Sequence, residues 1–335
     1  MNDLTILMPT FNRAEVLRVT LEALCEVRRG NLSVEIIVID NASSDATQQV
    51  LREFGGRLPL RVLHEPTPGK CNALNRALRE ASLGEIVVFT DDDVTPDAAW
   101  FEAIRATCQR WPEHSVFGGR IDVGWPAAVP KPAWLADKRI QAVAFSAHHL
   151  GDRECAYAVG EPFGPNFWVR RAALAGAEFR ADLGPHPTRR TLGDESEFLR
   201  QLRRRGHVPI YSPVARVVHR IEPERTTRSA VYRRAVQSGR GTVHVEGVPE
   251  SALLERSRLG WHLRIVSNVA VSALQWLGAA LEPDEIVRFH KLFGGAFTFS
   301  KNWEALRSAG RIVPSRLRGT PASASMRIPK IHIDQ

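Results

Sequence analysis

Short apolar runs alternate with helix-like stretches over the first third of the chain. Four runs of mostly β-branched and aliphatic residues predict strands at 4–8, 34–39, 60–63 and 86–89. Apolar residues at helical spacing predict helices over 12–30, 45–54 and 70–81. Strands that alternate with helices are typical of βαβ units, so the pattern predicts a doubly wound α/β fold with a mostly parallel sheet flanked by helices.

The alternation becomes weaker after a helix predicted over 97–110. Further strands are expected at 115–123, 155–159, 163–169, 208–211 and 214–218. Two prolines and a glycine predict a loop at 184–187, and apolar residues at helical spacing predict a helix over 192–206. From residue 222 onward the pattern favours helices alone, so we expect a helical C-terminal extension.

The longest apolar stretch, residues 263–281, contains polar side chains at every third or fourth position. These are Arg264, Asn268, Ser272 and Gln275, which share one helical stripe. A helix spanning a bilayer would have to hide this stripe from lipid, so the pattern favours an amphipathic helix on a core, a partner or a bilayer surface. Of these, a helix packed in a core is the commonest.

Composition and charge narrow the class of protein. The chain has 335 residues, 44% of them hydrophobic, and a formal net charge of +8, which indicates an anionic partner such as nucleic acid, an acidic lipid surface or a phosphorylated substrate. The four cysteines form no CxxC pair, and the N-terminus lacks the pattern of a signal peptide, so we expect a cytoplasmic protein.

Polar residues follow three of the predicted strands directly. Pro9-Thr10, Asp40-Asn41 and the triplet Asp91-Asp92-Asp93 all begin where an apolar run ends. Ligands of open α/β sheets bind beyond the carboxyl ends of the strands. Adjacent carboxylates repel one another unless a cation lies among them, and their oxygens suit Mg²⁺ or Mn²⁺. No GxGxxG fingerprint and no P-loop motif occurs in the sequence.

Six short motifs occur in order along the chain. They are MPTFNR (8–13), IDNASSD (39–45), GKCNALN (69–75), FTDDD (89–93), GPNFWVRR (164–171) and GDESEF (193–198). Together they resemble the family-two, GT-A-fold inverting glycosyltransferases of bacterial type. The resemblance covers about the first two-thirds of the chain, and it implies a Rossmann-like GT-A sheet and transfer of a sugar from a nucleotide-diphosphate sugar, with UDP-sugar as the expected donor.

The resemblance also implies a binding site for the nucleotide sugar. The residues it assigns to that site are Pro9, Thr10, Asp40, Asn41, Lys70, Asn75, Asp91 and Asp92. Asp40 would accept a hydrogen bond from the imide of uracil or thymine. The metal ligands that the resemblance implies are Asp93, Asp91 and His219, which would hold Mn²⁺ or Mg²⁺.

A carboxylate at the start of a helix serves as general base in this family, typically within a Glu-Asp pair. Here the pair is reversed as Asp194-Glu195. Alignment through the following Ser-Glu-Phe puts Glu195 at the base position, with Asp194 as the alternative. An acidic first helical turn also suits the helix dipole, and this structural explanation holds for either residue.

These assignments divide the chain into regions and leave several functions open. We expect a glycosyltransferase domain at 1–222, with a nucleotide-binding half (1–110) and an acceptor half (111–222). A helical region at 223–310 and a basic tail at 311–335, whose composition favours disorder, would follow. The acceptor would be a glycan, a lipid-linked sugar or a small molecule, as in the synthesis of polysaccharide or glycolipid.

The alternatives are a sugar-phosphate nucleotidyltransferase and a non-catalytic protein that binds an anionic polymer. The first needs a Gly-rich basic loop after the first strand, which MPTFNR lacks. For the second, no nucleic-acid motif is present, so we expect no nucleic-acid partner. The basic charge and the helical C-terminal region also allow peripheral docking on the inner face of the membrane, near a lipid-carried acceptor.

Overall fold

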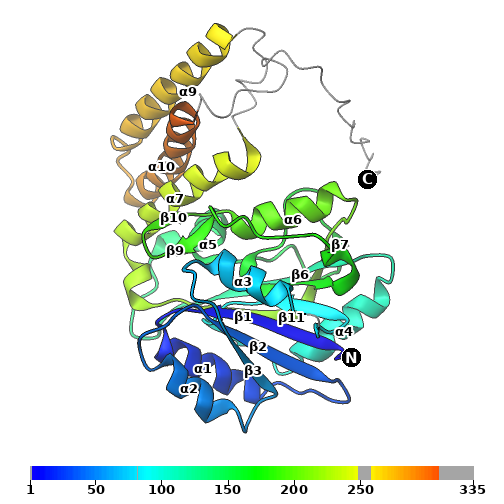
Figure 1. Cartoon of the computed structure of the whole chain (residues 1–335). Coiled ribbons are helices and arrows are strands. Elements are labelled where there is room, and N and C mark those ends of the chain that lie inside the picture. Colours follow the sequence, from blue (N-terminus) through cyan, green and yellow to red (C-terminus); the bar gives the residue numbers. More distant parts are fainter. Residues whose placement is uncertain (1, 81, 248–257, 309–335) are drawn as a thin grey trace.

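A nine-stranded sheet forms the centre of the protein (Figure 1). The computed structural model describes residues 2–80, 82–247 and 258–308, so the tail predicted at 311–335 lies outside the described residues. The strands of this sheet are β1 (Leu4–Thr10), β2 (Val34–Asp40), β3 (Leu60–His64), β4 (Ile86–Phe89), β5 (Val94–Pro96), β6 (Val116–Gly124), β7 (Cys155–Ala156), β8 (Phe167–Arg170) and β11 (Ile210–Arg220). Their order is β3-β2-β1-β4-β8-β6-β11-β5, and β7 pairs with β11.

Most of the long strands run in one direction. β1 pairs in parallel with β2 and β4, β2 with β3, and β6 with β11. β8 is antiparallel to β4 and β6, and β5 and β7 are antiparallel to β11. The predicted α/β fold with a mostly parallel sheet flanked by helices is confirmed.

Helices cover both faces of the sheet. The helices are α1 (Ala14–Cys25), α2 (Thr47–Phe54), α3 (Lys70–Leu78), α4 (Trp100–Arg110), α5 (Lys138–Phe145), α6 (Asp194–Arg204), α7 (Arg228–Glu246), α9 (Arg258–Ala279) and α10 (Glu285–Arg307). Strand side chains alternate between the faces, so Ile6 packs with α1, α2 and α4, whereas Leu7 packs with α3 and α6.

Several predicted elements differ from the structure in the second half of the sheet. The strand predicted at 163–169 begins only at β8, because Gly164–Asn166 forms a 3₁₀ turn. The strands predicted at 208–211 and 214–218 are one strand, β11, whose register shifts between Ser212 and Arg216. The strand predicted at 155–159 shortens to the two residues of β7.

Three strands, β5 (Val94–Pro96), β9 (Gly184–His186) and β10 (Arg189–Thr191), were not predicted. β5 lies where the sequence suggests the start of a helix, and it pairs with β11. The segment predicted as a loop at 184–187 forms β9 (Gly184–His186), an antiparallel partner of β10 (Arg189–Thr191). Both strands of a two-stranded hairpin are edge strands, so β9 tolerates Pro185, which lacks an N–H, at its middle position.

The described residues after β11 form helices, as predicted for the C-terminal region. α10 packs against both α7 and α9, and α7, α9 and α10 lie together at the end of the molecule opposite to α1 and α2 (Figure 1). None of the described helices combines the length and the apolar character needed to cross a bilayer. The exact domain boundaries stay a prediction.

Candidate active site

A cavity of about 1000 Å³ opens at the carboxyl ends of the central strands. Its wall includes the residues that follow β1 and β4, the end of β11, the hairpin of β9 and β10, the first turn of α6, and one side of α7. Parallel strands deliver their carboxyl ends to a common edge, which is why polar segments far apart in sequence meet here. Most of the predicted site residues lie on this wall: Pro9, Thr10, Asn41, Lys70, Asp91, Asp92, Asp93, Asp194, Glu195 and His219.

Two carboxylates of the acidic triplet share one arginine. Arg13 Nη1 lies 2.6 Å from Asp92 Oδ1, and Arg13 Nη2 lies 3.1 Å from Asp93 Oδ2. Thr10 Oγ1 also donates to Asp92 Oδ2 at 2.6 Å. Burial of Asp92 raises the pKa of its carboxyl to about 7, although the positive charge of Arg13 acts in the opposite direction. The arginine therefore supplies the positive charge that the sequence pattern attributed to a metal ion alone.

Asp93 and His219 face one another at the floor of the cavity. Burial alone raises the pKa of Asp93, but the charges of His219, Arg13 and Arg225 lower it well below its ordinary value. His219 Nδ1 lies 2.6 Å from the carbonyl oxygen of Phe145 and must donate to it. The other ring nitrogen, Nε2, lies 3.3 Å from Asp93 Oδ1.

Asp93 and His219 have side chains of the kinds that bind divalent cations, and they would supply two of the ligands. Asp93 Oδ1 is buried and makes no hydrogen bond. The bond from His219 Nδ1 to the carbonyl oxygen of Phe145 is of the kind that orients the ring of a metal-binding histidine. Two ligands at right angles, each about 2.1 Å from a Mg²⁺ or Mn²⁺ ion, are about 3.0 Å apart, close to the observed separation. These residues therefore fit a divalent cation that takes its other ligands from phosphate and water.

The part of the chain that the structure describes offers no complete cage for a metal. Within it, no three His, Cys, Asp or Glu side chains are grouped closely enough to hold an ion by themselves. Asp91, predicted as a second ligand, instead pairs with Lys70 at 2.6 Å. Mg²⁺ commonly binds through one or two carboxylates and the phosphates of a substrate, so the arrangement suits an ion that arrives with its ligand.

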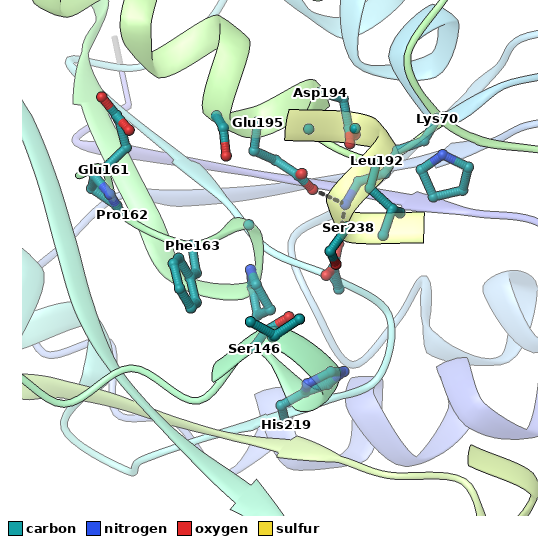
Figure 2. A pocket seen from close by; sticks show the side chains of 18 of the residues that line it. Lys70, Ser146, Glu161, Pro162, Phe163, Leu192, Asp194, Glu195, His219 and Ser238 are labelled. Carbon is teal, nitrogen blue, oxygen red and sulfur yellow. Dashed lines mark hydrogen bonds and ion pairs between the residues drawn. The ribbon is translucent and has the colours of Figure 1, made fainter. Parts of the chain in front are cut away.

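Lys70 links Asp91 to Glu195. Its Nζ lies 2.6 Å from Asp91 Oδ1 and 2.7 Å from Glu195 Oε1, and Figure 2 shows the side chains of Lys70 and Glu195 pointing at one another. Burial alone would lower the pKa of Lys70, but the carboxylates of Asp91, Glu195 and Asp194 raise it well above its ordinary value. The ammonium group is therefore charged and forms an ion pair with each of the two acidic side chains.

The two acids at the start of α6 differ in protonation. Burial would raise the pKa of Glu195, but the ion pair with Lys70 lowers it to about 2. Burial and the neighbouring charge of Glu195 raise the pKa of Asp194 well above its ordinary value, and Asp194 Oδ2 is buried without a hydrogen-bond partner. Glu195 therefore carries a negative charge near neutral pH.

Glycines make room for this acid pair. Gly193, which precedes α6, has φ 110°, a left-handed conformation that glycine adopts without strain. A methyl group on Gly164 would collide with the Glu195 carboxylate, and one on Gly184 would lie 2.8 Å from Asp194 Oδ2. The Gly-Pro-Asn turn at 164–166 is thus the surface on which the Glu195 side chain rests.

Two predicted residues lie off the cavity wall. Asp40 is buried at the end of β2, opposite Thr10 in the sheet, and accepts hydrogen bonds from the backbone of Ser43 and the side chain of Gln48. Asn75 binds both backbone groups of Phe179 at 2.8 Å, which fixes the segment behind α3. The structure therefore brings neither side chain to the cavity.

Asn41 lies at the cavity edge and organises the loop after β3. Its amide donates to the carbonyl oxygens of Glu65 and Thr67, and its Oδ1 accepts from the backbone of Gly69 at 2.7 Å. Those bonds place the first turn of α3, and with it Lys70, beside the ends of β1 and β2. Asn41 thus acts on the site through the backbone that it holds.

Sequence reasoning missed three residues that the geometry makes important. Arg13 pairs with Asp92 and Asp93, Arg225 Nη1 lies 3.5 Å from Asp93 Oδ2, and Gly164 borders Glu195. Arg13 and Gly164 belong to the motifs MPTFNR and GPNFWVRR, so their position in these motifs is a sequence signal that points to them. Arg225 follows the last strand in a segment without a motif, and only the fold brings it to Asp93.

Known proteins resemble this chain in sequence. A model of glycosyl transferase family 2 matches residues 5–176, about half of the chain. Chondroitin synthase of Escherichia coli is 30% identical over 104 residues, which are 30% of this chain and 15% of that protein. Glycosyltransferase AglE of Haloferax volcanii is 28% identical over 123 residues, or 36% of this chain and 40% of AglE. The matched segments span less than half the length of these curated relatives.

A solved structure shows a similar fold over most of the chain. It is mannosyltransferase PcManGT from Pyrobaculum calidifontis in complex with GDP-Man and Mn²⁺, with a TM-score of 0.57 and 22% identity. The similarity covers 91% of this chain and 87% of that one. It extends past the residues that the family model matches and includes part of the helical C-terminal region.

Proposed function

The chain belongs to glycosyl transferase family 2, and from this premise we propose that it transfers a sugar from a nucleotide-diphosphate sugar to a hydroxyl acceptor, with inversion at the anomeric carbon and with a divalent cation. One observation carries the proposal. A single cavity contains a carboxylate kept anionic by a lysine, Glu195, and a carboxylate–imidazole pair suited to a cation, Asp93 and His219.

The donor would bind along the carboxyl ends of β1, β2 and β4. Pro9, Thr10 and Asn41 border this part of the cavity and would surround the base and the ribose. PcManGT, which shares the fold, binds GDP-Man, so the fold accommodates a nucleotide sugar. Uridine stays our expected base. Because both oxygens of Asp40 already accept hydrogen bonds, its contact with uracil would require Ser43 or Gln48 to give way.

Departure of the nucleoside diphosphate is the step that needs positive charge. When bound, Mn²⁺ or Mg²⁺ would neutralise the charge that develops on the diphosphate, and Asp93 and His219 are the residues that would hold it. Asp91 would complete the acidic side of this site once a bound donor attracts Lys70. Arg13 keeps Asp92 and Asp93 in place throughout, because it pairs with both carboxylates.

Glu195 would accept the proton of the acceptor hydroxyl. A hydroxyl is a poor nucleophile near neutral pH, and inversion requires that it attack from the side opposite to the leaving diphosphate. Glu195 lines the cavity, is anionic, and stands on the first turn of α6, whose positive end further favours a negative charge. The carboxyl of Asp194 is buried and its pKa is raised well above the ordinary value, which supports a structural role for it.

The experiment that tests this proposal measures the products. Purified protein would be incubated with UDP-, dTDP- and GDP-sugars and a mixture of simple glycosides, with Mn²⁺ or with EDTA, and the released nucleoside diphosphate and the glycosidic product would be quantified. We expect one donor to be consumed only with the metal, and NMR of the product to show inverted anomeric configuration.

Three outcomes would contradict the proposal. Release of pyrophosphate together with a newly formed nucleotide sugar would indicate a nucleotidyltransferase. Full activity after exhaustive removal of divalent metal would contradict the role of the cation, and retained anomeric configuration would contradict the role of Glu195 as base.

A further inference from the structure

Helix α9 has two different faces. On one face Trp261 and Ile265 are fully buried, and Ala279 is nearly so. This face packs against α10, where the indole of Trp276 stacks on Phe299 with ring centroids 5.6 Å apart. One face of α9 is thus packed against the rest of the protein. Core packing therefore does not explain the apolar residues on its other face.

The opposite face of α9 is apolar and exposed. Its residues recur every three or four positions and continue one step past the end of the helix; we call them the apolar stripe: Leu263, Val266, Ala270, Leu274, Leu277 and Leu281. The exposed fractions of Leu274, Leu277 and Leu281 are 70%, 67% and 85%. At 1.5 Å per residue the stripe is about 27 Å long. Aligned exposed leucines of this kind mark an interaction surface, whereas single exposed ones do not.

The polar residues of α9 differ in exposure, since Arg264 and Gln275 are exposed and Asn268 is half-buried. Ser272 is buried, and its hydroxyl bonds back to the carbonyl oxygen of Asn268. The side chain of Asn302 in α10 donates to the same carbonyl oxygen at 3.1 Å. Part of the polar stripe therefore lies against α10, and the apolar stripe is left outward.

Charge favours a lipid surface over a second copy of the helix. α9 contains no aspartate or glutamate, and its charged residues, Arg258 and Arg264, are basic. A copy of α9 would therefore bring further positive charge to this face. The headgroup region of an anionic bilayer offers phosphates beside an apolar layer, and the whole chain carries a net charge of +8.

Aromatic side chains of α10 also favour contact with a lipid surface. Trp303 is 41% exposed and stacks on Phe299, with ring centroids 6.1 Å apart. Tryptophan is enriched where a protein meets the headgroups, because its ring is apolar and its N–H can bond to water or to lipid. The pair of helices thus combines exposed leucines, a partly exposed indole and basic charge.

We propose that the apolar stripe of α9 docks this protein on a bilayer that contains anionic lipid, with the helix lying in the plane of the headgroups. The helix does not cross the bilayer, because its other face remains packed on α10. Docking of this kind needs no change in the fold, since the stripe is already exposed. It goes beyond sugar transfer and would hold whatever the cavity binds close to a membrane surface.

A sedimentation assay tests the proposal directly. The full-length protein would be mixed at low salt with phosphatidylcholine vesicles that do or do not contain phosphatidylglycerol, and the bound fraction would be measured after centrifugation. We expect binding to the anionic vesicles, weaker binding at high salt, and about a tenfold or larger loss of the partition coefficient in the double variant Leu274→Glu with Leu277→Glu.

A matched control separates the stripe from overall charge. The double variant Val19→Glu with Val214→Glu makes the same change of charge at exposed apolar residues of α1 and β11, and it should bind like the wild type. Because every one of these residues is exposed, both variants should fold, and circular dichroism checks this.

Three results would overturn the proposal. The wild type could stay in the supernatant with anionic vesicles at low salt, it could bind neutral vesicles equally well, or both double variants could lose binding to the same extent. If light scattering instead finds a dimer that Leu274→Glu with Leu277→Glu dissociates, the stripe is a contact between two copies. The assay contains no sugar donor, so a negative result would contradict membrane docking but not the proposed transferase activity.

Discussion

Lys70 Nζ lies 2.7 Å from Glu195 Oε1, although 125 residues separate the two in the chain. The lysine starts α3 and the glutamate lies in the first turn of α6, so the ion pair connects the half of the molecule that would bind the donor to the acid that would take the proton. The same ammonium contacts Asp91 at 2.6 Å. Lys70 therefore sets both the position and the charge of Glu195.

Glu195→Gln should abolish transfer without weakening donor binding. Glutamine preserves the shape of the side chain but cannot accept the proton, and loss of a general base typically lowers kcat by about 10²–10⁴-fold. Release of nucleoside diphosphate reports kcat, and calorimetry reports donor affinity. The control is Glu197→Gln in the same helical turn, because Glu197 bonds to Gln201 and does not border the cavity. An equal loss in both variants would contradict the assignment.

Lys70→Met should shift the pH dependence of kcat. The wild-type lysine lowers the pKa of Glu195 to about 2, against the effect of burial. Without it, only the hydrogen bonds from Asp194 and from the backbone oppose the effect of burial, so the pKa of Glu195 should rise. A carboxyl accepts no proton below its pKa, so activity on the acid side should fall at a higher pH than in the wild type.

Lys70→Arg serves as the matched variant, because it keeps a positive charge beside Glu195. Its acid-side profile should resemble that of the wild type even if its kcat is lower. If Lys70→Met merely lowers activity by one factor at every pH, the lysine has a structural role only.

Gly164→Ala should reduce kcat with little effect on donor affinity. The added methyl group would occupy the place of the Glu195 carboxylate, which must then move away from Lys70. A displacement of about 1 Å at a reacting group can cost about 10²-fold in rate. Gly56→Ala is the control, since a methyl group there meets no atom within 4 Å. Unchanged kcat in Gly164→Ala would show that the acid tolerates displacement.

His219→Ala should increase the Mn²⁺ concentration needed for half-maximal activity. The variant removes the imidazole Nε2 beside Asp93 but leaves the carboxylate and any phosphate ligands, so metal binding should weaken by about 10–100-fold or more. Metal titrations of activity and of thermal stability in the presence of donor measure this. His186→Ala, also on the cavity wall but away from Asp93, is the comparison. An identical metal requirement in the two variants would exclude His219 as a ligand.

Arg13→Ala should destabilise the fold. It leaves the buried carboxylates of Asp92 and Asp93 without their shared partner, and breaking a buried ion pair costs about 3–5 kcal/mol. In the wild type, burial raises the pKa of Asp92 to about 7 against the effect of Arg13, so removal of the arginine should raise this pKa further, and protonation then removes one unpaired charge. The loss in free energy of unfolding, measured with urea over a range of pH, should therefore be smaller on the acid side. Arg13→Lys should recover part of the lost free energy of unfolding, because lysine keeps a positive charge near both carboxylates.

The amino-acid sequence by itself determined the sheet around the site. Apolar runs that end on Thr10, Asp40 and Asp91 predict strands whose polar ends meet, and the register confirms that Thr10 lies opposite Asp40. The strand prediction was correct because a strand buried on both faces is apolar along its whole length, so its ends are visible in the sequence. Parallel pairing then brings the carboxyl ends of neighbouring strands to one edge of the sheet. The motifs also pointed to Asp194 and Glu195, whose roles stay predictions until they are measured.

Tertiary structure alone decided the partners of these side chains. No local sequence pattern predicts that Arg13 pairs with Asp92 and Asp93 or that Lys70 pairs with Glu195. The same is true of the hairpin formed by β9 and β10. The exposed side of α9 is a similar case, because periodicity defines two faces of a helix but not which of them a neighbour covers. Such contacts join residues distant in sequence, so they depend on packing and on the mutual neutralisation of buried charge.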